Sequence, residues 1–227
     1  MNGFRLYKAA LGAAFFIAFV LSGSPVVADP ALDRALVAAA DRGDAKAVRK
    51  LLDQGANVDA RDAHRRTALL VATRANRVEV ARVLIEAGAD VNAKDDIEDS
   101  PYLYAGAEGR NEILKMTLAH GADLRSLNRY GGTALIPAAH HGHPETVRIL
   151  LAAGIDRNHI NNLGWTALLE AVILGDGGPV HADIVRQLVA AGANVNIADR
   201  GGMTPLGHAR QRRFDAIARI LEAAGAH

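Results

Sequence analysis

The sequence contains no cysteine and few aromatic residues, and both absences restrict what the protein can be. Among its 227 residues, aromatics make up 4% and tryptophan occurs once. The missing thiols exclude disulfides, thiolate metal sites, a cysteine nucleophile and the lipid-attachment cysteine of a bacterial lipoprotein. Half of the residues are nevertheless hydrophobic, and alanine and leucine dominate. This composition indicates one folded body of closely packed helices.

An excess of charge of one sign is also lacking. Lys and Arg number 26 against 25 Asp and Glu, and without residues 1–28, which hold Arg5 and Lys8 and no acid, the numbers become 24 and 25. No strongly basic face is expected, so we do not expect nucleic acid as a partner. The G-x-S-x-G, P-loop, H-E-x-x-H and dinucleotide-binding motifs are missing too. We therefore predict no enzyme activity and no cofactor.

The apolar run near the N-terminus is too short to be a typical membrane span. It extends from Ala9 to Leu21, 13 residues, whereas a spanning helix needs about 20. Basic Arg5 and Lys8 precede it and Val26-Val27-Ala28 follows, which is the pattern of a secretory signal peptide. We expect residues 1–28 to be removed, leaving an exported protein with no stable membrane anchor. An uncleaved anchor is the alternative.

Two sets of residues recur along the rest of the chain with one period. Glycines 33 residues apart are followed by one 38 residues later: Gly55, Gly88, Gly121, Gly154 and Gly192. Hydroxyl residues keep the same spacing and the same final step: Thr67, Ser100, Thr133, Thr166 and Thr204. A fixed period of this length indicates stacked supersecondary units, each of which buries its apolar face only against its neighbours.

Several motifs suggest the kind of unit. They are Gly202-Met203-Thr204-Pro205-Leu206, the Ala-Ala-x-x-Gly-His of Ala138 to His143, and the Gly-Ala-Asn-Val-Asn of Gly192 to Asn196. The chain from about residue 31 to 227 resembles ankyrin-repeat proteins. This resemblance implies a mainly α fold, an ankyrin-repeat solenoid of paired antiparallel helices joined by β-hairpin-like finger loops. The expected domain is 29–227, with units at about 31–61, 62–94, 95–127, 128–160, 161–198 and 199–227.

Local signals place the helices inside each unit. The recurring Thr or Ser is expected to cap an inner helix, with Pro101 and Pro205 at the first helical position. The inner helix should end at a residue that tolerates the left-handed conformation: Gly43, Asn76, Gly109, Gly142 or Gly175. An outer helix with apolar residues on one face follows. The extra residues, Asp176 to Val180, are predicted to form a loop between the two helices of the fifth unit.

Two clusters raise the question of chemistry beyond scaffolding. His140, His141 and His143, with Glu108 from the preceding unit, suggest a metal site, but adjacent helical residues point apart, and a zinc site needs three or four convergent ligands. We therefore favour a structural role and predict no metal. A hydrolase built on Asp176, His181 and Asp183 is a remote alternative.

In ankyrin-repeat proteins the finger tips and the exposed face of the inner helices form a concave surface that binds other proteins. The resemblance implies this role for the finger residues His64, Arg66, Ile97, Asp99, Tyr130, Leu163, Trp165 and Met203. It implies the same role for the inner-helix residues Arg74, Tyr104, Glu108, His140, His141, Glu170 and Leu174. Aromatic residues are typical interface hot spots, although a finger aromatic that packs on the next finger is the alternative for Tyr130 and Trp165.

We therefore predict a monomeric, non-catalytic protein-binding module. The resemblance is to exported ankyrin-repeat proteins of bacteria, which implies a periplasmic location and a partner protein whose identity the sequence does not reveal. A metal- or small-ligand-binding accessory factor in periplasmic stress defence, using the histidines and Glu170, is the second hypothesis.

Overall fold

The computed structural model describes residues 29–227, so the predicted signal peptide and its cleavage site lie outside the described residues. Within 29–227 the chain forms twelve α-helices and no named strand. The inner helices are α1 (Pro30–Arg42), α3 (Ala68–Arg74), α5 (Pro101–Ala107), α7 (Leu135–His140), α9 (Ala167–Ile173) and α11 (Pro205–Gln211). The outer helices are α2 (Ala45–Asp53), α4 (Val78–Glu86), α6 (Asn111–Ala119), α8 (Pro144–Ala152), α10 (Pro179–Ala190) and α12 (Asp215–Ala223).

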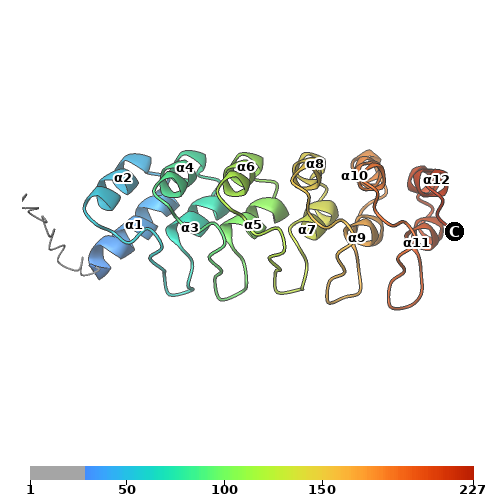
Figure 1. Ribbon diagram of the computed structural model, residues 1–227, viewed down its shortest axis with the longest axis horizontal. Helices are drawn as coiled ribbons and strands as arrows, with labels where there is room; N and C mark the ends of the chain where they lie inside the picture. Colours follow the sequence, from blue (N-terminus) through green and yellow to red (C-terminus); the bar gives the residue numbers. More distant parts are fainter. Residues whose placement is uncertain (1–28) are drawn as a thin grey trace, which may run out of the picture.

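The helices form two rows, and loops project on the side of the inner row that faces away from the outer row (Figure 1). Each inner helix packs against its outer partner and against the next inner helix. This is the predicted solenoid of paired helices with finger loops. None of the described helices is long and apolar enough to cross a membrane.

Small residues let the inner helices approach one another closely. A Cβ added at Gly106 would lie 2.8 Å from the Cβ of Ala134 on the next unit. Between the two rows, leucine and isoleucine side chains such as Leu84, Leu114 and Leu150 are fully buried. The core therefore runs along the whole stack, because every unit buries apolar area against its neighbours, two for an internal unit and one for an end unit.

The predicted N-caps are present in four of the five units that carry a Thr or Ser at this position. The side chains of Thr67, Ser100, Thr166 and Thr204 each accept a hydrogen bond from the backbone N–H three residues on. The prediction is wrong for Thr133, whose buried hydroxyl has no hydrogen-bond partner. Pro137 is the reason, because it has no N–H to donate to the Thr133 carbonyl, which instead accepts from Ile136. The helix consequently begins later, at Leu135.

The turn between the two helices of the fifth unit also differs from the prediction. Gly43, Asn76, Gly109 and Gly142 have positive φ as expected, but in the fifth unit it is Gly177 that does (φ 72°), not Gly175. Pro179 and Val180 belong to α10, so only part of the inserted segment is a loop. Proline is favoured in the first turn of a helix, and the insertion thereby lengthens the outer helix.

Each finger from the second unit to the sixth is closed by an Asp or Asn at its first position. One side-chain oxygen accepts hydrogen bonds from the backbone N–H groups two and four residues on, as in Asn161 with Leu163 and Trp165. The same geometry occurs at Asp62, Asp95, Asn128 and Asp199. Asx side chains hold turns in this way without strand pairing, and the described residues show only an isolated bridge, between Arg61 and Thr67.

Candidate functional site

A groove of about 540 Å³ lies between the inner helices of the second to fifth units and the fingers of the third to fifth units. All but four of the residues predicted to bind a partner line it: Ile97, Asp99, Tyr130, Leu163, Arg74, Tyr104, Glu108, His140, His141, Glu170 and Leu174. They come from α3, α5, α7 and α9 and from the fingers between them. Hereafter "the groove" means this cavity.

Apolar side chains along the groove are unusually exposed. The exposed fractions are 44% for Ile97, 54% for Tyr130, 47% for Leu163 and 42% for Leu174. Three of these residues sit at neighbouring finger tips, where the Asx turn directs the chain outward. Exposed apolar side chains gathered in one groove are typical of interaction sites, and aromatics supply much of the energy at interfaces.

At its N-terminal end the groove contains a balanced set of charges. Arg74 Nη1 lies 3.5 Å from Asp95 and 3.3 Å from Asp99, and its guanidinium stacks on the ring of Tyr104, 4.7 Å from the centroid. Arg129 lies 3.7 Å from Asp99 and stacks on Tyr130. Burial and the neighbouring Asp95 raise the pKa of Asp99, while Arg129 and Arg74 oppose that rise. The two arginines are therefore neutralised by this chain itself.

The floor of the groove holds a carboxylate of a different kind. Glu170 is 6% exposed and accepts a hydrogen bond of 2.8 Å from the side chain of Asn161. Its other oxygen lies 3.9 Å from Nδ1 of His140. Burial raises the pKa of Glu170, against the effect of Asn161 and of His141. Burial also lowers the pKa of His140, as do His141 and His181.

The histidine cluster does not converge on one point. The ring of His141 lies 4.7 Å from that of His140, but its Nδ1 is 2.8 Å from the carbonyl of Ala107 and 3.8 Å from Glu108. His143 lies at the next turn, beside Gly109. Among residues 29–227, no group of three or more His, Asp or Glu side chains is arranged to hold a metal ion. The geometry therefore offers the metal-binding hypothesis no support.

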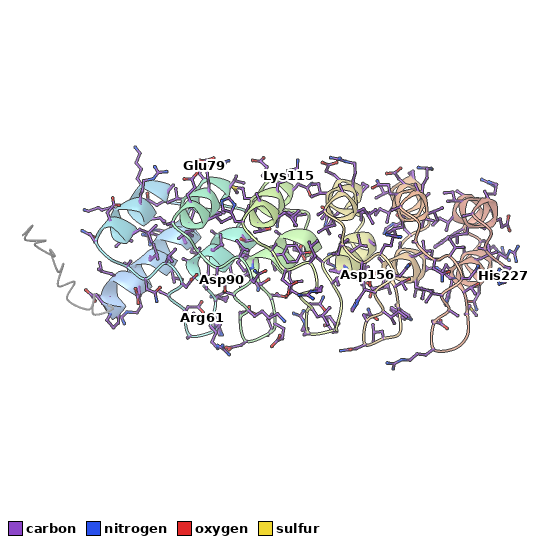
Figure 2. All side chains as sticks on the ribbon, in the orientation of Figure 1. Arg61, Glu79, Asp90, Lys115, Asp156 and His227 are labelled. Atoms are coloured by element: carbon purple, nitrogen blue, oxygen red, sulfur yellow. The ribbon has the colours of Figure 1, made fainter. Side chains whose placement is uncertain are left out.

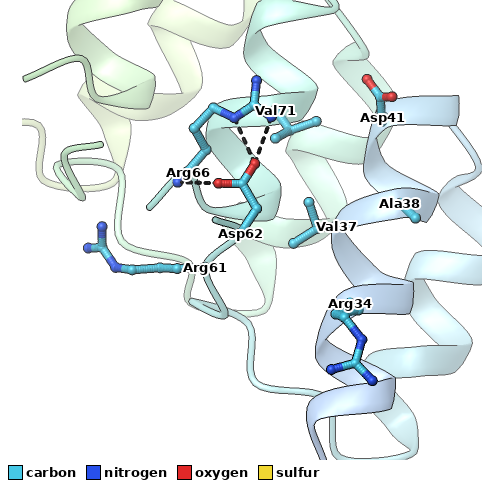
Figure 3. Close-up of a pocket in the computed structure, with 8 residues that line it drawn as sticks. All are labelled: Arg34, Val37, Ala38, Asp41, Arg61, Asp62, Arg66 and Val71. Atoms are coloured by element: carbon cyan, nitrogen blue, oxygen red, sulfur yellow. Dashed lines mark hydrogen bonds and ion pairs between the residues drawn. The ribbon is translucent and has the colours of Figure 1, made fainter. Parts of the chain in front are cut away.

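Four predicted contact residues lie outside the groove. Trp165 is half-buried, His64 and Met203 are exposed, and Arg66 lines a second cavity of about 310 Å³ at the N-terminal end of the stack. Figure 3 shows Arg66 paired with Asp62 on one side of this cavity and Arg34 and Val37 of α1 on the other. Burial opposes ionisation of Asp62, but hydrogen bonds from Arg66 and from the backbone hold its pKa below the ordinary value. This arginine is engaged within the chain.

Of the three residues of the hypothetical hydrolase site, Asp176 and His181 are brought together and Asp183 is not. His181 has both ring nitrogens occupied, one 2.8 Å from Asp176 and the other 3.0 Å from the carbonyl of His140. Asp183 instead pairs with Arg186 and Gln187 on its own helix. His181 thus ties the inserted segment to the fourth unit, and it has no free nitrogen to act as a general base.

Sequence reasoning missed several residues of the groove, chief among them Arg129, Asn128, Asn161, Ile136 and Pro137. The recurring Asp or Asn, 33 or 38 residues apart, was a usable signal for Asn128 and Asn161, because such residues close turns. Arg129 adjoins Tyr130 at the finger tip, and its pairing with Asp99 crosses between two units.

The sequence matches the model of a known protein family. The sequence model described as "Ankyrin repeats (3 copies)" matches residues 8–95 and 102–199, more than half of the chain. The chain belongs to the ankyrin-repeat family. Ankyrin repeats generally mediate protein–protein interactions and are generally non-enzymatic.

Solved ankyrin structures share the arrangement along most of their length. An ankyrin repeat domain from Acinetobacter baumannii AYE is 60% identical with a TM-score of 0.83, covering 85% of this chain and 98% of that one. The ankyrin repeat protein EF0377 is 44% identical with a TM-score of 0.81, covering 84% of this chain and 97% of that one. The human ASB11 ankyrin repeat domain is 27% identical with a TM-score of 0.73, covering 85% and 84%.

A curated relative matches over a shorter stretch. The putative ankyrin repeat protein YahD of Escherichia coli (strain K12) is 47% identical over 57 residues, which are 25% of this chain and 28% of that protein. This match therefore supports the family assignment and does not extend to the whole of YahD.

Proposed function

We propose that the protein is a monomeric binding module that takes up a partner protein in the groove. The observation that carries this proposal is the row of exposed apolar side chains, Ile97, Tyr130, Leu163 and Leu174, along a cavity large enough for several side chains. A rigid stack presents these side chains in fixed positions, so little conformational entropy is lost when a partner binds.

We further propose that this binding takes place in the exported compartment, the bacterial periplasm. The support is the sequence pattern of Arg5, Lys8, the apolar run and Ala28. N-terminal sequencing of the protein recovered from its source cells should yield Asp29 as the first residue. A protein that retains Met1 or lies in the cytoplasmic fraction would refute this part of the proposal.

The binding function is tested by partner capture with surface variants. The full chain is immobilised, cross-linked to the extract of its own cellular fraction, and compared with the double variant Tyr130→Ser and Leu163→Ser. Recovery of a specific partner should fall by about tenfold or more, since interface hot spots carry most of the binding energy. Circular dichroism should show both proteins equally folded, because the two side chains are exposed.

A matched control variant separates the groove from the insertion. Val180 is also an exposed apolar residue, but it lies in the first turn of α10 and does not line the groove. Val180→Ser should leave capture unchanged. If Val180→Ser abolishes capture while the double variant does not, the partner binds at the inserted segment and the groove is not the site.

A further inference from the structure

The repeat itself does not require a glutamate at position 170. At the equivalent place in the other inner helices, four residues after the capping Thr or Ser, stand Val71, Tyr104, Pro137 and His208. Burial of a carboxylate costs free energy unless a charge or several hydrogen bonds compensate it. Glu170 receives one hydrogen bond, from Asn161. The requirements of the repeat fold therefore do not explain why this position holds a glutamate.

Neither groove glutamate has a permanent positive charge beside it. Among the ion pairs of the described residues, Glu170 and Glu108 contact only His140 and His141, at 3.9 and 3.8 Å. The nearby arginines, Arg74 and Arg129, form ion pairs with Asp95 and Asp99 instead. Burial, His141 and His181 disfavour the protonated form of His140. This part of the groove therefore holds two carboxyl groups whose only ion-pair partners among the described residues are histidines.

The surroundings of the two carboxylates suit a long cationic side chain better than a bare ion. Tyr130, Leu163 and Leu174 line the same cavity and are exposed. Lysine and arginine bury their aliphatic stems along apolar surface while the charged end reaches a polar partner. A charged end that meets a desolvated carboxylate forms the stronger, charge-assisted kind of hydrogen bond.

We propose that Glu170, together with Glu108 of the same groove, forms a subsite for a lysine or arginine side chain of an extended segment of the partner protein. An apolar residue of the same segment lies against Tyr130 and Leu163. This inference rests on the proposed binding function and specifies the chemistry of the partner.

The test selects displayed random linear peptides on the full chain. Selected peptides should contain a lysine or arginine next to an apolar residue. The Kd of one such synthetic peptide, measured by calorimetry, should rise by about 10-fold to 100-fold for Glu170→Gln. Replacing the peptide's basic residue by methionine should raise it similarly, and combining both changes should add little, because each removes the same contact.

A matched variant controls for net charge. Glu79→Gln removes the same charge from the outer helix α4, and Figure 2 shows Glu79 on the edge of the molecule away from the fingers. The Kd should not change. An unaltered thermal unfolding profile of Glu170→Gln, or a more stable one, excludes loss of folding as the cause.

The alternative results separate this inference from the proposed function. Peptides without a basic residue, bound in a manner that depends on Tyr130 and Leu163, would overturn the cationic subsite and leave the binding function standing. If no groove variant changes the Kd of the selected peptides, both the cationic subsite and the proposed binding function of the groove are overturned. Absence of selected peptides, or binding of spermidine alone in the groove, would overturn the extended segment as occupant.

Discussion

The two ends of the groove differ in whether their charged side chains are neutralised within the chain. At the N-terminal end, Arg74 lies between Asp95 and Asp99, and Arg129 adds a second cation from the next finger. Elsewhere in the groove, the only ion-pair partners of Glu170 and Glu108 among the described residues are histidines. The first arrangement is complete within the chain and stabilises the contact between units, whereas the second lacks a cation. The difference teaches that a charge on the concave surface indicates a partner only when the chain does not neutralise it.

Removal of Arg74 should have the largest effect on stability. Arg74→Met leaves Asp95 and Asp99 close together without the cation that contacts both of them, and Asp95 has only 4% of its side chain exposed. We expect a loss of about 2 kcal/mol in the free energy of unfolding, below the full cost of breaking a buried pair because Arg74 is partly exposed. Urea denaturation followed by circular dichroism measures it.

Arg129→Met is the matched comparison for this prediction. Arg129 is more exposed, and its one carboxylate partner, Asp99, is 3.7 Å away, so its loss should cost less than about 1 kcal/mol. Equal losses for both arginines would show that the N-terminal end of the groove is not held together by Arg74.

Neutralising Glu170 should increase the free energy of unfolding, whereas removal of either arginine decreases it. Because burial raises the pKa of Glu170, the folded state binds its proton more tightly than the unfolded state does. The free energy of unfolding therefore falls as the pH rises from the pKa of Glu170 in the unfolded chain to its higher pKa in the folded protein. Above that range the loss no longer changes with pH. Glu170→Gln does not titrate, so it does not lose stability in this way, and its amide oxygen can still accept the hydrogen bond from Asn161. At pH 7 we expect it to be more stable by about 1 kcal/mol.

Thermal unfolding at a series of pH values checks both the sign and the window. The difference between Glu170→Gln and the parent should grow with pH through the window and then stay level. A variant that is less stable at pH 7 would mean that Glu170 stabilises the stack, and the contrast between the two ends of the groove would disappear.

The smallest effect is expected in the finger of the third unit. Glu98 has a φ of 65°, where the equivalent residue of the fourth finger is Gly131 with a φ of 69°. A non-glycine residue pays about 1 kcal/mol in this conformation. Glu98→Gly should relieve this strain and lose the exposed contact with Lys94, for a net gain of about 0.5 kcal/mol in unfolding free energy.

Two further variants separate these contributions by the same denaturation measurement. Glu98→Ala loses the Lys94 contact but keeps the strain, so it should be no more stable than the parent. Gly131→Ala should be destabilised, because its new Cβ would lie 2.5 Å from the Asn162 side chain in addition to the strained φ. If Glu98→Gly and Glu98→Ala behave alike, backbone strain in the finger is negligible.

Much of the fold followed from signals that repeat along the chain. The spacing of Thr67, Ser100 and Thr166 located the inner helices, and the structure places caps at each. Errors arose where a local signal competed with another residue. Pro137 deprived Thr133 of its expected role, and the insertion moved the left-handed residue from Gly175 to Gly177, which packs beside Phe214 of the last unit.

The sequence by itself determined the period, the pairing of helices and the positions that face the concave side. These features depend on contacts within one unit or between equivalent positions of adjacent units. Only the tertiary structure decided which concave residues gather into one groove, that Trp165 lies outside it, and that Arg74 is neutralised while Glu170 is not. The physical reason is that these outcomes depend on distances between side chains of different units. Stacking sets those distances, and no single unit encodes them.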